Sequence, residues 1–190
     1  MSYLKKHFLI HVMACFATSF LVAQTTVVPD SNFENYLETH DANGLVVSVG
    51  DNTSMGDGVE GNGLVLTNRI SSVLILNISN LSINTLLGIE DFASLETLIC
   101  NNNNLIELDV SNNNNLTSLL CGINQLTNLI TGLSNDKLEV LDCSNNQLTE
   151  LILQENNTAR YPLLKELTCS NNRLKSIDVS QNTDLISLAI

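Results

Sequence analysis

The sequence predicts a solenoid of stacked repeats, made mostly of short parallel β-strands and turns, with a short helix covering its N-terminal end. One phrase of leucine, cysteine and asparagine occurs four times along the chain, centred on Cys100, Cys121, Cys143 and Cys169. These cysteines are 21, 22 and 26 residues apart, and such a period is the signature of repeats that stack on one another. Within each copy leucine and cysteine alternate with period two, as the inward residues of a half-buried strand do.

Residues 1–24 have the composition of a secretory signal peptide. Lys5 and Lys6 give the positive start, residues 8–22 form an apolar stretch, and Ala23 offers a small side chain for cleavage before Gln24. The apolar stretch is too short and too often interrupted to span a membrane, since a spanning helix needs about 20 apolar residues. We therefore expect an exported chain without a membrane span.

An alternative to ordinary cleavage is a lipid anchor at Cys15. Residues 12–15 (VMAC) loosely match the motif that precedes a lipidated cysteine. A lipidated cysteine should be followed by a polar tether, whereas residues 16–23 are mostly apolar. The sequence therefore favours an unlipidated mature chain over a lipoprotein.

The mature chain is strongly acidic. Removing the leader takes away two of the eight basic side chains and none of the 20 acidic ones, which leaves a formal charge of 6 − 20 = −14. This charge argues against nucleic acid or an anionic membrane surface as a partner. It favours a cationic protein or a metal ion, although only through long-range attraction. The length of 190 residues accommodates one domain behind the leader.

Residues 25–72 are expected to form an N-terminal cap and an acidic, glycine-rich loop. Ser31 and Glu34 have the spacing of a capping box, in which each side chain bonds the backbone N–H of the other residue. A solenoid needs its first coil covered, so the short helix that follows is predicted to be the cap. His40 is expected to be a packed or half-exposed residue and not a ligand. One face of the helix is formed by residues at i, i+3, i+4 and i+7, namely Phe33, Tyr36, Leu37 and His40.

The loop spans residues 41–63 and contains six of the nine glycines. We expect it to run over the surface, since nothing in it suits a hydrophobic core. Its acidic side chains leave one alternative open, a calcium site formed by Asp51, Asp57 and Glu60. The spacing fails the EF-hand pattern from Asp51 and again from Asp57, so we predict no metal site.

The repeat region is predicted to cover residues 73–190. Each unit has a cysteine half and a second half that ends near an asparagine such as Asn113, so strands are expected on two sides of the coil. The slots of Val73, Leu76 and Ile78 match those of the first cysteine copy, 22 residues later. Five units and a truncated sixth follow from this phase: 73–94, 95–115, 116–137, 138–163, 164–184 and 185–190.

The chain resembles the secreted, internalin-like leucine-rich repeat proteins of Bacteroidetes-type bacteria. Its cysteine copies fit the leucine-rich repeat pattern L-x-x-L-x-L-x-x-N-x-L, with cysteine in the third leucine slot. Three further segments match phrases of that family: 28–34 (VPDSNFE), 87–92 (LGIEDF) and 108–111 (LDVS), the last repeated as IDVS at 177–180. The resemblance implies a leucine-rich repeat solenoid of the horseshoe class, and it implies a protein or a glycan as the ligand.

The periodic asparagines and cysteines have structural explanations. Asn103 and Asn113 are expected to satisfy backbone groups that the coil turns inward and to stack on the asparagines of the next coil. The cysteines share their slot with Ile78 and Ile190, so we predict a ladder of buried free thiols. Disulfides are a weaker alternative, because side chains at equivalent positions run parallel instead of converging. Zinc is weaker still, since no histidine or paired cysteine joins the ladder.

The remaining candidate site is a surface. Residues between the inward slots of the cysteine strand project outward, on what we expect to be the concave face of the solenoid. This face is small, mostly neutral and without aromatic rings, which are favoured at protein hot spots. Its predicted ligand-binding residues are Thr97, Ile99, Asn101, Ser118, Leu120, Gly122, Val140, Asp142, Ser144, Glu166, Thr168 and Ser170.

These observations favour a secreted or cell-surface scaffold that recognises a protein or a glycan and has no enzymatic activity. His40 is the only histidine after the leader, and buried thiols disfavour the thiolate, so a cysteine–histidine active site is not expected. We expect no cofactor, because the sequence has neither a phosphate loop nor a nucleophile elbow. The alternative from another class is a targeting or docking region of a longer exoenzyme, whose catalytic part lies outside this chain.

We expect the leader to be cleaved near Ala23–Gln24, which gives a mature chain without lipid. N-terminal sequencing and intact mass of the exported protein should show an unmodified terminus close to Gln24. A Cys15→Ser variant, as the control, should be processed in the same way. A first residue of Cys15 carrying acyl groups would contradict the prediction.

Overall fold

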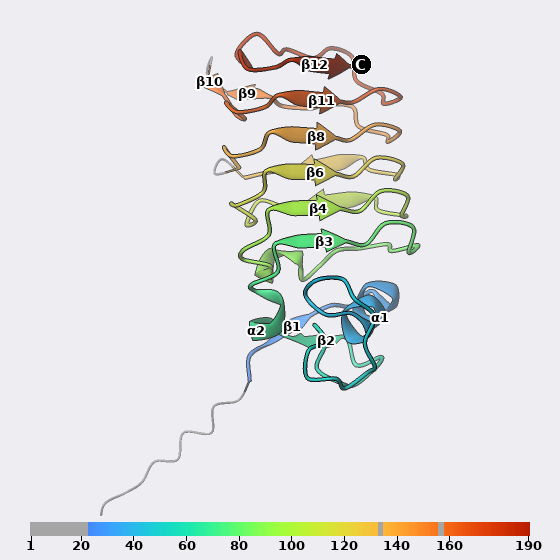
Figure 1. Cartoon of the computed structure of the whole chain (residues 1–190). Helices are drawn as coiled ribbons and strands as arrows, with labels where there is room; N and C mark the ends of the chain where they lie inside the picture. The colour runs from blue at the N-terminus through green and yellow to red at the C-terminus, as the bar shows by residue number, and fades with distance from the viewer. Residues whose placement is uncertain (1–22, 133–134, 156–157) are drawn as a thin grey trace, which may run out of the picture.

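The computed structural model describes residues 23–132, 135–155 and 158–190 (Figure 1). All but the last two residues of the predicted signal peptide, with Cys15 among them, lie outside this part of the chain. The helices of the described part are short, and none of them has the length and apolar character of a membrane span.

One parallel sheet of six strands forms the spine of the molecule, with one strand from each repeat unit. Figure 1 shows the strands stacked in chain order from the cap to the C-terminus. The register places equivalent slots side by side, so that Leu76 lies opposite Leu98 and Leu98 opposite Leu119. The predicted leucine-rich repeat solenoid is confirmed. The strands are β3 (Ile75–Asn77), β4 (Thr97–Ile99), β6 (Ser118–Leu120), β8 (Val140–Asp142), β11 (Glu166–Thr168) and β12 (Ser187–Ala189).

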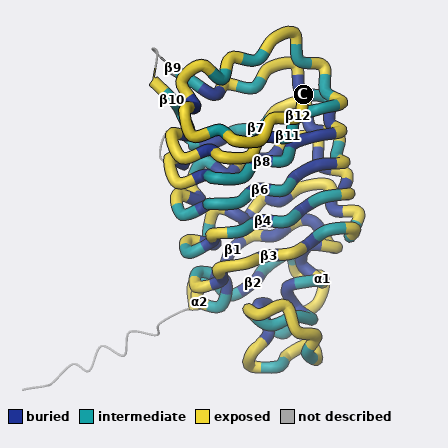
Figure 2. The backbone as a smooth tube through the Cα atoms, turned by 45° about the horizontal axis from the view of Figure 1, so that its top comes forward, coloured by how far each residue is buried: buried dark blue, intermediate teal, exposed yellow. Residues whose placement is uncertain are grey.

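Strands occur on the opposite side of the coil in the second and third units. There β5 (Glu107–Asp109) pairs in parallel with β7 (Asn128–Ile130). The longer fourth unit carries a two-stranded antiparallel hairpin instead, made of β9 (Gln154–Glu155) and β10 (Thr158–Ala159). Most leucines between the two sides are buried, and Figure 2 shows buried segments recurring along the stack. The coil is therefore a thin apolar core closed by two strand-bearing walls.

An asparagine closes each cysteine half by bonding the backbone of two coils. In the second unit, Oδ1 of Asn103 accepts from the N–H groups of Leu81 (3.1 Å) and Ile83 (3.0 Å). Its Nδ2 donates to the carbonyls of Ile78 (2.8 Å) and Cys100 (3.0 Å). The same bonding recurs at Asn124, Asn146 and Asn172. The predicted satisfaction of inward backbone groups is confirmed, and the bonding partners are backbone atoms.

A second row of asparagines lies on the other side of the coil. Nδ2 of Asn113 donates to the carbonyl of Ile89 (2.8 Å), and Nδ2 of Asn182 donates to that of Tyr161 (2.9 Å). In the third unit this place is taken by Asn135, whose Nδ2 donates to the carbonyl of Asn113 (2.9 Å). The repeat phase had also pointed to Asn156 for the fourth unit, and that residue lies outside the described part of the chain.

The cap consists of a β-ribbon and two helices below the first coil. Strand β1 (Thr25–Val27) pairs antiparallel with β2 (Leu64–Leu66). Helix α1 (Ser31–Thr39) lies beside this ribbon in Figure 1, helix α2 (Thr67–Ile70) follows β2, and the 3-10 turn η1 (Ile89–Asp91) sits within the first unit. Phe33 and Leu37 of α1 are fully buried, and the ring of Phe33 stacks on that of Phe92 with centroids 6.2 Å apart. The predicted capping helix is therefore joined directly to the repeat core.

The predicted capping box is wrong in its detail, because Asp30 and not Ser31 caps α1. Oδ1 of Asp30 accepts from the N–H groups of Asn32 (3.0 Å) and Phe33 (3.1 Å). Oδ2 of Asp30 accepts from the N–H of Asn84 (2.8 Å), which ties the cap to the first repeat unit. Oε1 of Glu34 bonds the backbone of the loop instead, at Asn62 and Gly63. A carboxylate serves here better than a hydroxyl, since its two oxygens can satisfy the helix and the repeat together.

The expectation that loop 41–63 contributes nothing to the core is also wrong. Met55 is only 2% exposed and belongs to the hydrophobic core. Polar side chains from the two helices pin the loop around it. Nη1 of Arg69 donates to the carbonyl of Gly56 (2.9 Å), and the Glu38 carboxylate accepts from the N–H groups of Asp57 (2.6 Å) and Gly58 (2.9 Å). Because these bonds satisfy the loop backbone, it can fold tightly enough to turn Met55 inward.

The four cysteines of the repeats are buried free thiols, at most 2% exposed, as their shared slot with the buried Ile78 predicted. Burial raises the pKa of Cys100 and of Cys143 to about 12. It raises the pKa of the Cys169 thiol as well. The ladder therefore acts as part of the core, with its sulfur atoms kept in the unreactive protonated form.

Replacing one ladder asparagine should destabilise the fold strongly. Asn146→Ala removes the acceptor of the Leu126 N–H (2.9 Å) and the donor to the carbonyls of Cys121 and Cys143 (both 3.0 Å). We expect the free energy of unfolding, measured in urea, to fall by about 1–3 kcal/mol or more. Asn114→Ala is the matched control, since Asn114 is exposed, and should change it by no more than about 0.5 kcal/mol. Equal effects at the two sites would show that the ladder bonds contribute little.

Cys143→Ala should destabilise the protein and also change how its stability depends on alkaline pH. The lost sulfur leaves a small cavity, which costs about 1–2 kcal/mol at pH 7. Above the ordinary thiol pKa of 9.0 the unfolded chain releases the Cys143 proton, whereas the folded chain holds it up to about pH 12. The free energy of unfolding therefore falls with rising pH, by up to about 1.4 kcal/mol per pH unit for each buried thiol.

The variant lacks one such thiol, so its stability should fall less steeply than that of the parent between pH 9 and 10.5. Urea titrations at a series of pH values measure both slopes. Parallel curves would contradict burial of a protonated Cys143, and a matched Cys169→Ala series tests the same effect at the end of the ladder.

Candidate ligand-binding face

The outer face of the six-stranded sheet consists of two rows of side chains that flank the buried leucines. The in-register pairing of the strands aligns each row along the solenoid. The first row is Ile75, Thr97, Ser118, Val140, Glu166 and Ser187. The second row is Asn77, Ile99, Leu120, Asp142, Thr168 and Ala189. These rows form one continuous surface, which we call the sheet face.

Eight of the twelve predicted site residues lie in these two rows, on β4, β6, β8 and β11. All eight are partly or fully exposed. The other four follow two residues after the rows: Asn101, Gly122, Ser144 and Ser170. The structure therefore brings the predicted set together along one side of the molecule.

Gly122 and Ser144 are buried, so the expectation that all twelve residues project outward is wrong for these two. Side chains of the fourth unit close over Gly122. A Cβ added there would lie 3.2 Å from both Oδ1 of Asp142 and Oγ of Ser144. Ser144 is itself held in a turn, where its N–H donates to Oδ1 of Asp142 (2.9 Å).

The sequence interpretation missed four residues of the face, Ile75 and Asn77 on β3 and Ser187 and Ala189 on β12. Ile75 is 61% exposed and Asn77 is exposed beside it. The signal for them was available, because Leu76 had been aligned with Leu98 and its neighbours could have been aligned as well. The face accordingly begins one unit closer to the cap than predicted.

The cap adds an aromatic ring at that end of the face. A hollow of about 540 Å³ lies between β3 and the cap. Tyr36 lines it, and its ring stacks on that of His40 with centroids 4.0 Å apart. His40 is half-buried, as expected for a packed residue, with Nδ1 2.9 Å from the Tyr36 carbonyl. The other lining residues are Asp41, Ala42, Asn43, Gly44, Met55, Ser72, Leu74, Ile75, Leu76 and Asn77.

Tyr36 is held as a neutral hydroxyl that can donate. Burial, together with the nearby Asp41 carboxylate, raises the pKa of its phenol above the ordinary 10.0. Oδ1 of Asp41 is occupied by the N–H groups of Asn43 and Leu45, both at 2.9 Å. A neutral hydroxyl, an acidic oxygen and amide groups therefore surround an apolar floor, which suits a ligand of mixed character.

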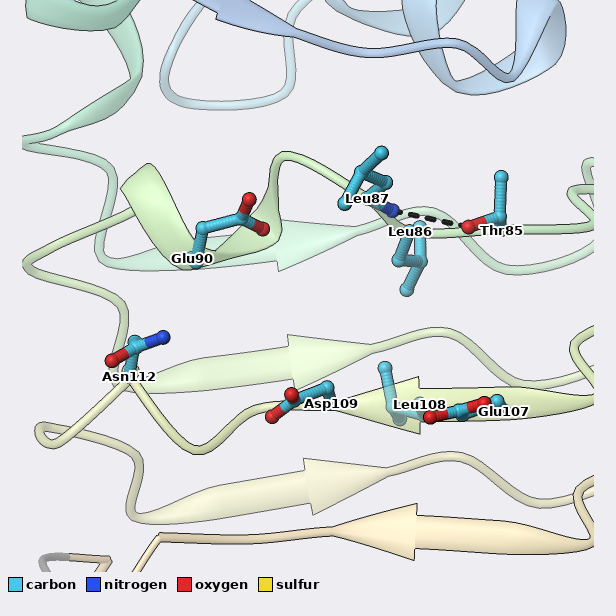
Figure 3. Close-up of a pocket in the computed structure, with 8 residues that line it drawn as sticks. All are labelled: Thr85, Leu86, Leu87, Glu90, Glu107, Leu108, Asp109 and Asn112. Atoms are coloured by element: carbon cyan, nitrogen blue, oxygen red, sulfur yellow. Dashed lines mark hydrogen bonds between the residues drawn. The ribbon is translucent and has the colours of Figure 1, made fainter.

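A second hollow lies on the opposite side of the coil (Figure 3). Its volume is about 380 Å³, and three carboxylates line it: Glu107 and Asp109 from β5, and Glu90 from η1. Two of them are engaged locally, since Glu90 accepts from the N–H of Gly88 (2.8 Å) and Asp109 from that of Ser111 (2.9 Å). The hollow adds to the negative field of the protein, but its residues come from a short stretch of two coils.

Two of the carboxylates considered for calcium, those of Asp51 and Asp57, bond the backbone of their own loop. Oδ1 of Asp51 accepts from the N–H of Thr53 (2.8 Å), and Oδ1 of Asp57 from that of Val59 (2.9 Å). Each carboxylate thus closes a local turn. Over residues 23–132, 135–155 and 158–190, no three Asp, Glu, His or Cys side chains gather as a metal-holding group.

Comparisons with known proteins agree with this architecture. The chain is similar to the solved functional domain of InlJ from Listeria monocytogenes, which includes a cysteine ladder. The two share 33% sequence identity over 88% of this chain, with a TM-score of 0.69. The fold is internalin-like. An internalin (inlF) from Listeria monocytogenes matches 84% of this chain and 48% of its own length at 18% identity and a TM-score of 0.53, which concerns the fold alone.

The chain spans about one third of the InlJ domain, 33% of its length. No protein-family model and no curated protein matches the sequence. The likeness therefore establishes the leucine-rich repeat fold. The thiol ladder is shown by the buried free cysteines of this chain itself.

Proposed function

We propose that this protein is an exported, non-enzymatic leucine-rich repeat scaffold that binds another protein through its sheet face. One observation carries the proposal: the outer rows form a continuous exposed surface that the fold itself does not use. Ile99 and Leu120 are adjacent in the register and only partly buried, and Ile75 is exposed in the other row, next to Thr97. Apolar side chains grouped on an open face are typical of an interaction surface. The likeness to internalin-like repeat proteins supports the same use.

Charge indicates the kind of partner. The mature chain has a formal charge of −14, and the face itself carries Asp142 and Glu166. Its nearest cation, Lys165, is paired with Glu139 at 2.7 Å. A partner with a basic surface would therefore be attracted at long range and matched on contact. The two rows of the sheet face contain no lysine or arginine, which also disfavours nucleic acid as a partner.

A glycan is the second candidate ligand, and the hollow beside Tyr36 is the observation that favours it. Proteins bind sugars with hydroxyl, carboxylate and amide groups placed around an aromatic side chain. This hollow offers Tyr36, Asp41, Asn43 and Asn77. Its position at the end of the sheet face would allow one ligand to contact both.

Export is inferred from the leader, and a Bacteroidetes-type relationship from the segments 28–34 and 87–92. The alternative, a targeting region of a longer exoenzyme, uses the same face for docking. Sequence of the source gene beyond Ile190 separates the two: a catalytic domain favours the exoenzyme, and further repeats with a sorting signal favour the scaffold.

Binding through the sheet face predicts that Leu120→Lys weakens association with ligands selected on the parent protein. A displayed peptide library, panned on the chain, supplies binders whose affinity is measured by calorimetry. Leu120→Lys removes a contact and adds a positive charge on the face, so we expect a loss of about tenfold or more. Glu107→Gln, on the opposite side of the coil, changes the net charge equally and should leave affinity within about twofold.

Two results would count against the proposal. Loss of binding in Glu107→Gln with none in Leu120→Lys would place the ligand on the opposite side. A panel of binders that is indifferent to both variants would remove the sheet face from consideration. Circular dichroism and the urea midpoint of each variant confirm that it remains folded.

A further inference from the structure

The turns after the first five strands of the sheet face share a residue with left-handed backbone at the same position. It lies two positions after the cysteine slot, and its φ is between 53° and 62° in all five units. Asparagine tolerates this conformation better than other residues with a side chain, because its short polar group can bond locally. Four units place an asparagine there, and the third unit places an isoleucine. The residues are Asn80, Asn102, Ile123, Asn145 and Asn171.

The asparagines at this position form side-chain hydrogen bonds that isoleucine cannot form. Nδ2 of Asn102 donates to Oδ1 of Asn80 (2.6 Å), and Nδ2 of Asn171 donates to Oδ1 of Asn145 (3.0 Å). Ile123 stands between these two pairs and interrupts an amide ladder at the corner of the solenoid. It has a φ of 54°, which is a true outlier for a β-branched residue. At this position the third unit therefore lacks the side-chain hydrogen bond and has an unfavourable backbone conformation.

Packing does not compensate for this loss. The side chain of Ile123 is 55% exposed, and it belongs neither to the core nor to the partly buried residues that pack on the core. An exposed apolar group in a strained turn lowers the stability of the folded chain. Such a residue is best explained by a contact that the isolated chain does not show.

Gly122, directly before Ile123, is a second residue that differs from the other repeat units. The position before the left-handed residue is polar in the other cysteine units, at Asn101, Ser144 and Ser170, and is glycine at Gly122. A Cβ there would lie 3.2 Å and 3.3 Å from the two carboxylate oxygens of Asp142. The missing side chain leaves the space that the Asp142 carboxylate and the Ser144 hydroxyl occupy. Oδ1 of Asp142 accepts from the Ser144 N–H, and among the described residues no donor bonds Oδ2.

The same unit also contributes the apolar middle of the sheet face. Leu120 is separated from Gly122 only by the inward Cys121, and Ile99 is its register neighbour on β4. On the other side, the register neighbour of Leu120 is Asp142 on β8. Ile99, Leu120 and the Asp142 carboxylate are thus register neighbours across three adjacent coils, and the exposed Ile123 follows Leu120 by three residues.

We propose that Ile123 is the residue that determines which partner the sheet face binds. The partner segment is a polypeptide that places an aliphatic side chain against Ile123 and Leu120 and a lysine or arginine on Asp142. This inference rests on the proposed function, because it names the partner chemistry of the same face.

The test uses the whole chain and a defined probe, a synthetic peptide of four Lys-Leu-Ser repeats. Peptides of Lys-Ser-Ser and Glu-Leu-Ser repeats separate the contribution of charge from that of the aliphatic group. Ile123→Asn restores the residue type of the other units, so its thermal midpoint should rise by about 2–4 °C. Its affinity for the Lys-Leu-Ser peptide should nevertheless fall about tenfold. A simple loss of folding cannot produce this opposed pair of changes.

Ile106→Asn is the matched control, since Ile106 is 59% exposed but is not among the residues with left-handed backbone. It should change neither the midpoint nor the affinity. Asn145→Ile, the reverse exchange in the next unit, should lower the midpoint without strengthening binding.

Three outcomes would overturn the inference. The first is an unchanged or lowered midpoint in Ile123→Asn, and the second is equal weakening by Ile123→Asn and Ile106→Asn. The third is a Lys-Leu-Ser peptide that binds no better than the other two. If Leu120→Lys still weakens library-selected binders in any of these cases, the proposed function stands and only the role of Ile123 fails. If Leu120→Lys has no effect either, both fail.

Discussion

The solenoid depends on satisfying backbone groups that its tight turns take away from water. After the strand of each cysteine unit, an asparagine side chain bonds the carbonyl of the cysteine slot and at least one N–H group of the preceding coil. Asn146 serves two coils at once, through the N–H of Leu126 on one and the carbonyl of Cys143 on its own. An unsatisfied buried group costs about 1–3 kcal/mol, so each of these asparagines stabilises the closure of its coil.

The cysteines follow from the same turn. Each cysteine carbonyl accepts the asparagine amide three residues later, and the cysteine side chain is buried in the core. A small apolar group fits there, whereas larger side chains forced into a packed core cost about 1–3 kcal/mol. In the first unit the same slot holds Ile78, which is larger than cysteine. The cap, and not another coil, lies below it there. Burial also keeps these thiols protonated, which makes the ladder a packing device and not a redox site.

The repeats were predictable from sequence because the same pattern occurs several times. Aligning the copies with one another fixes the position of each unit. Strand positions, the buried thiols and most of the sheet face came from that phase alone. The cap has no such redundancy. Asp30 takes the helix cap because it also reaches Asn84, 54 residues away, a contact that no local pattern encodes. Met55 enters the core for a similar reason, since Arg69 and Glu38 hold its loop from two different helices. The errors of the prediction therefore come more from long-range polar contacts than from the apolar pattern.

The sheet face itself changes character along the solenoid. Near the cap its rows carry Ile75, Ile99 and Leu120, and from the fourth unit onward they carry Asp142 and Glu166. The fold needs none of these identities, because the buried leucines and asparagines hold each coil in the same way. Under the proposed function this gradient would orient the partner, with its apolar side chains toward the cap and its basic side chains away from it. A partner in the opposite orientation would bury carboxylates against apolar groups, which costs desolvation energy.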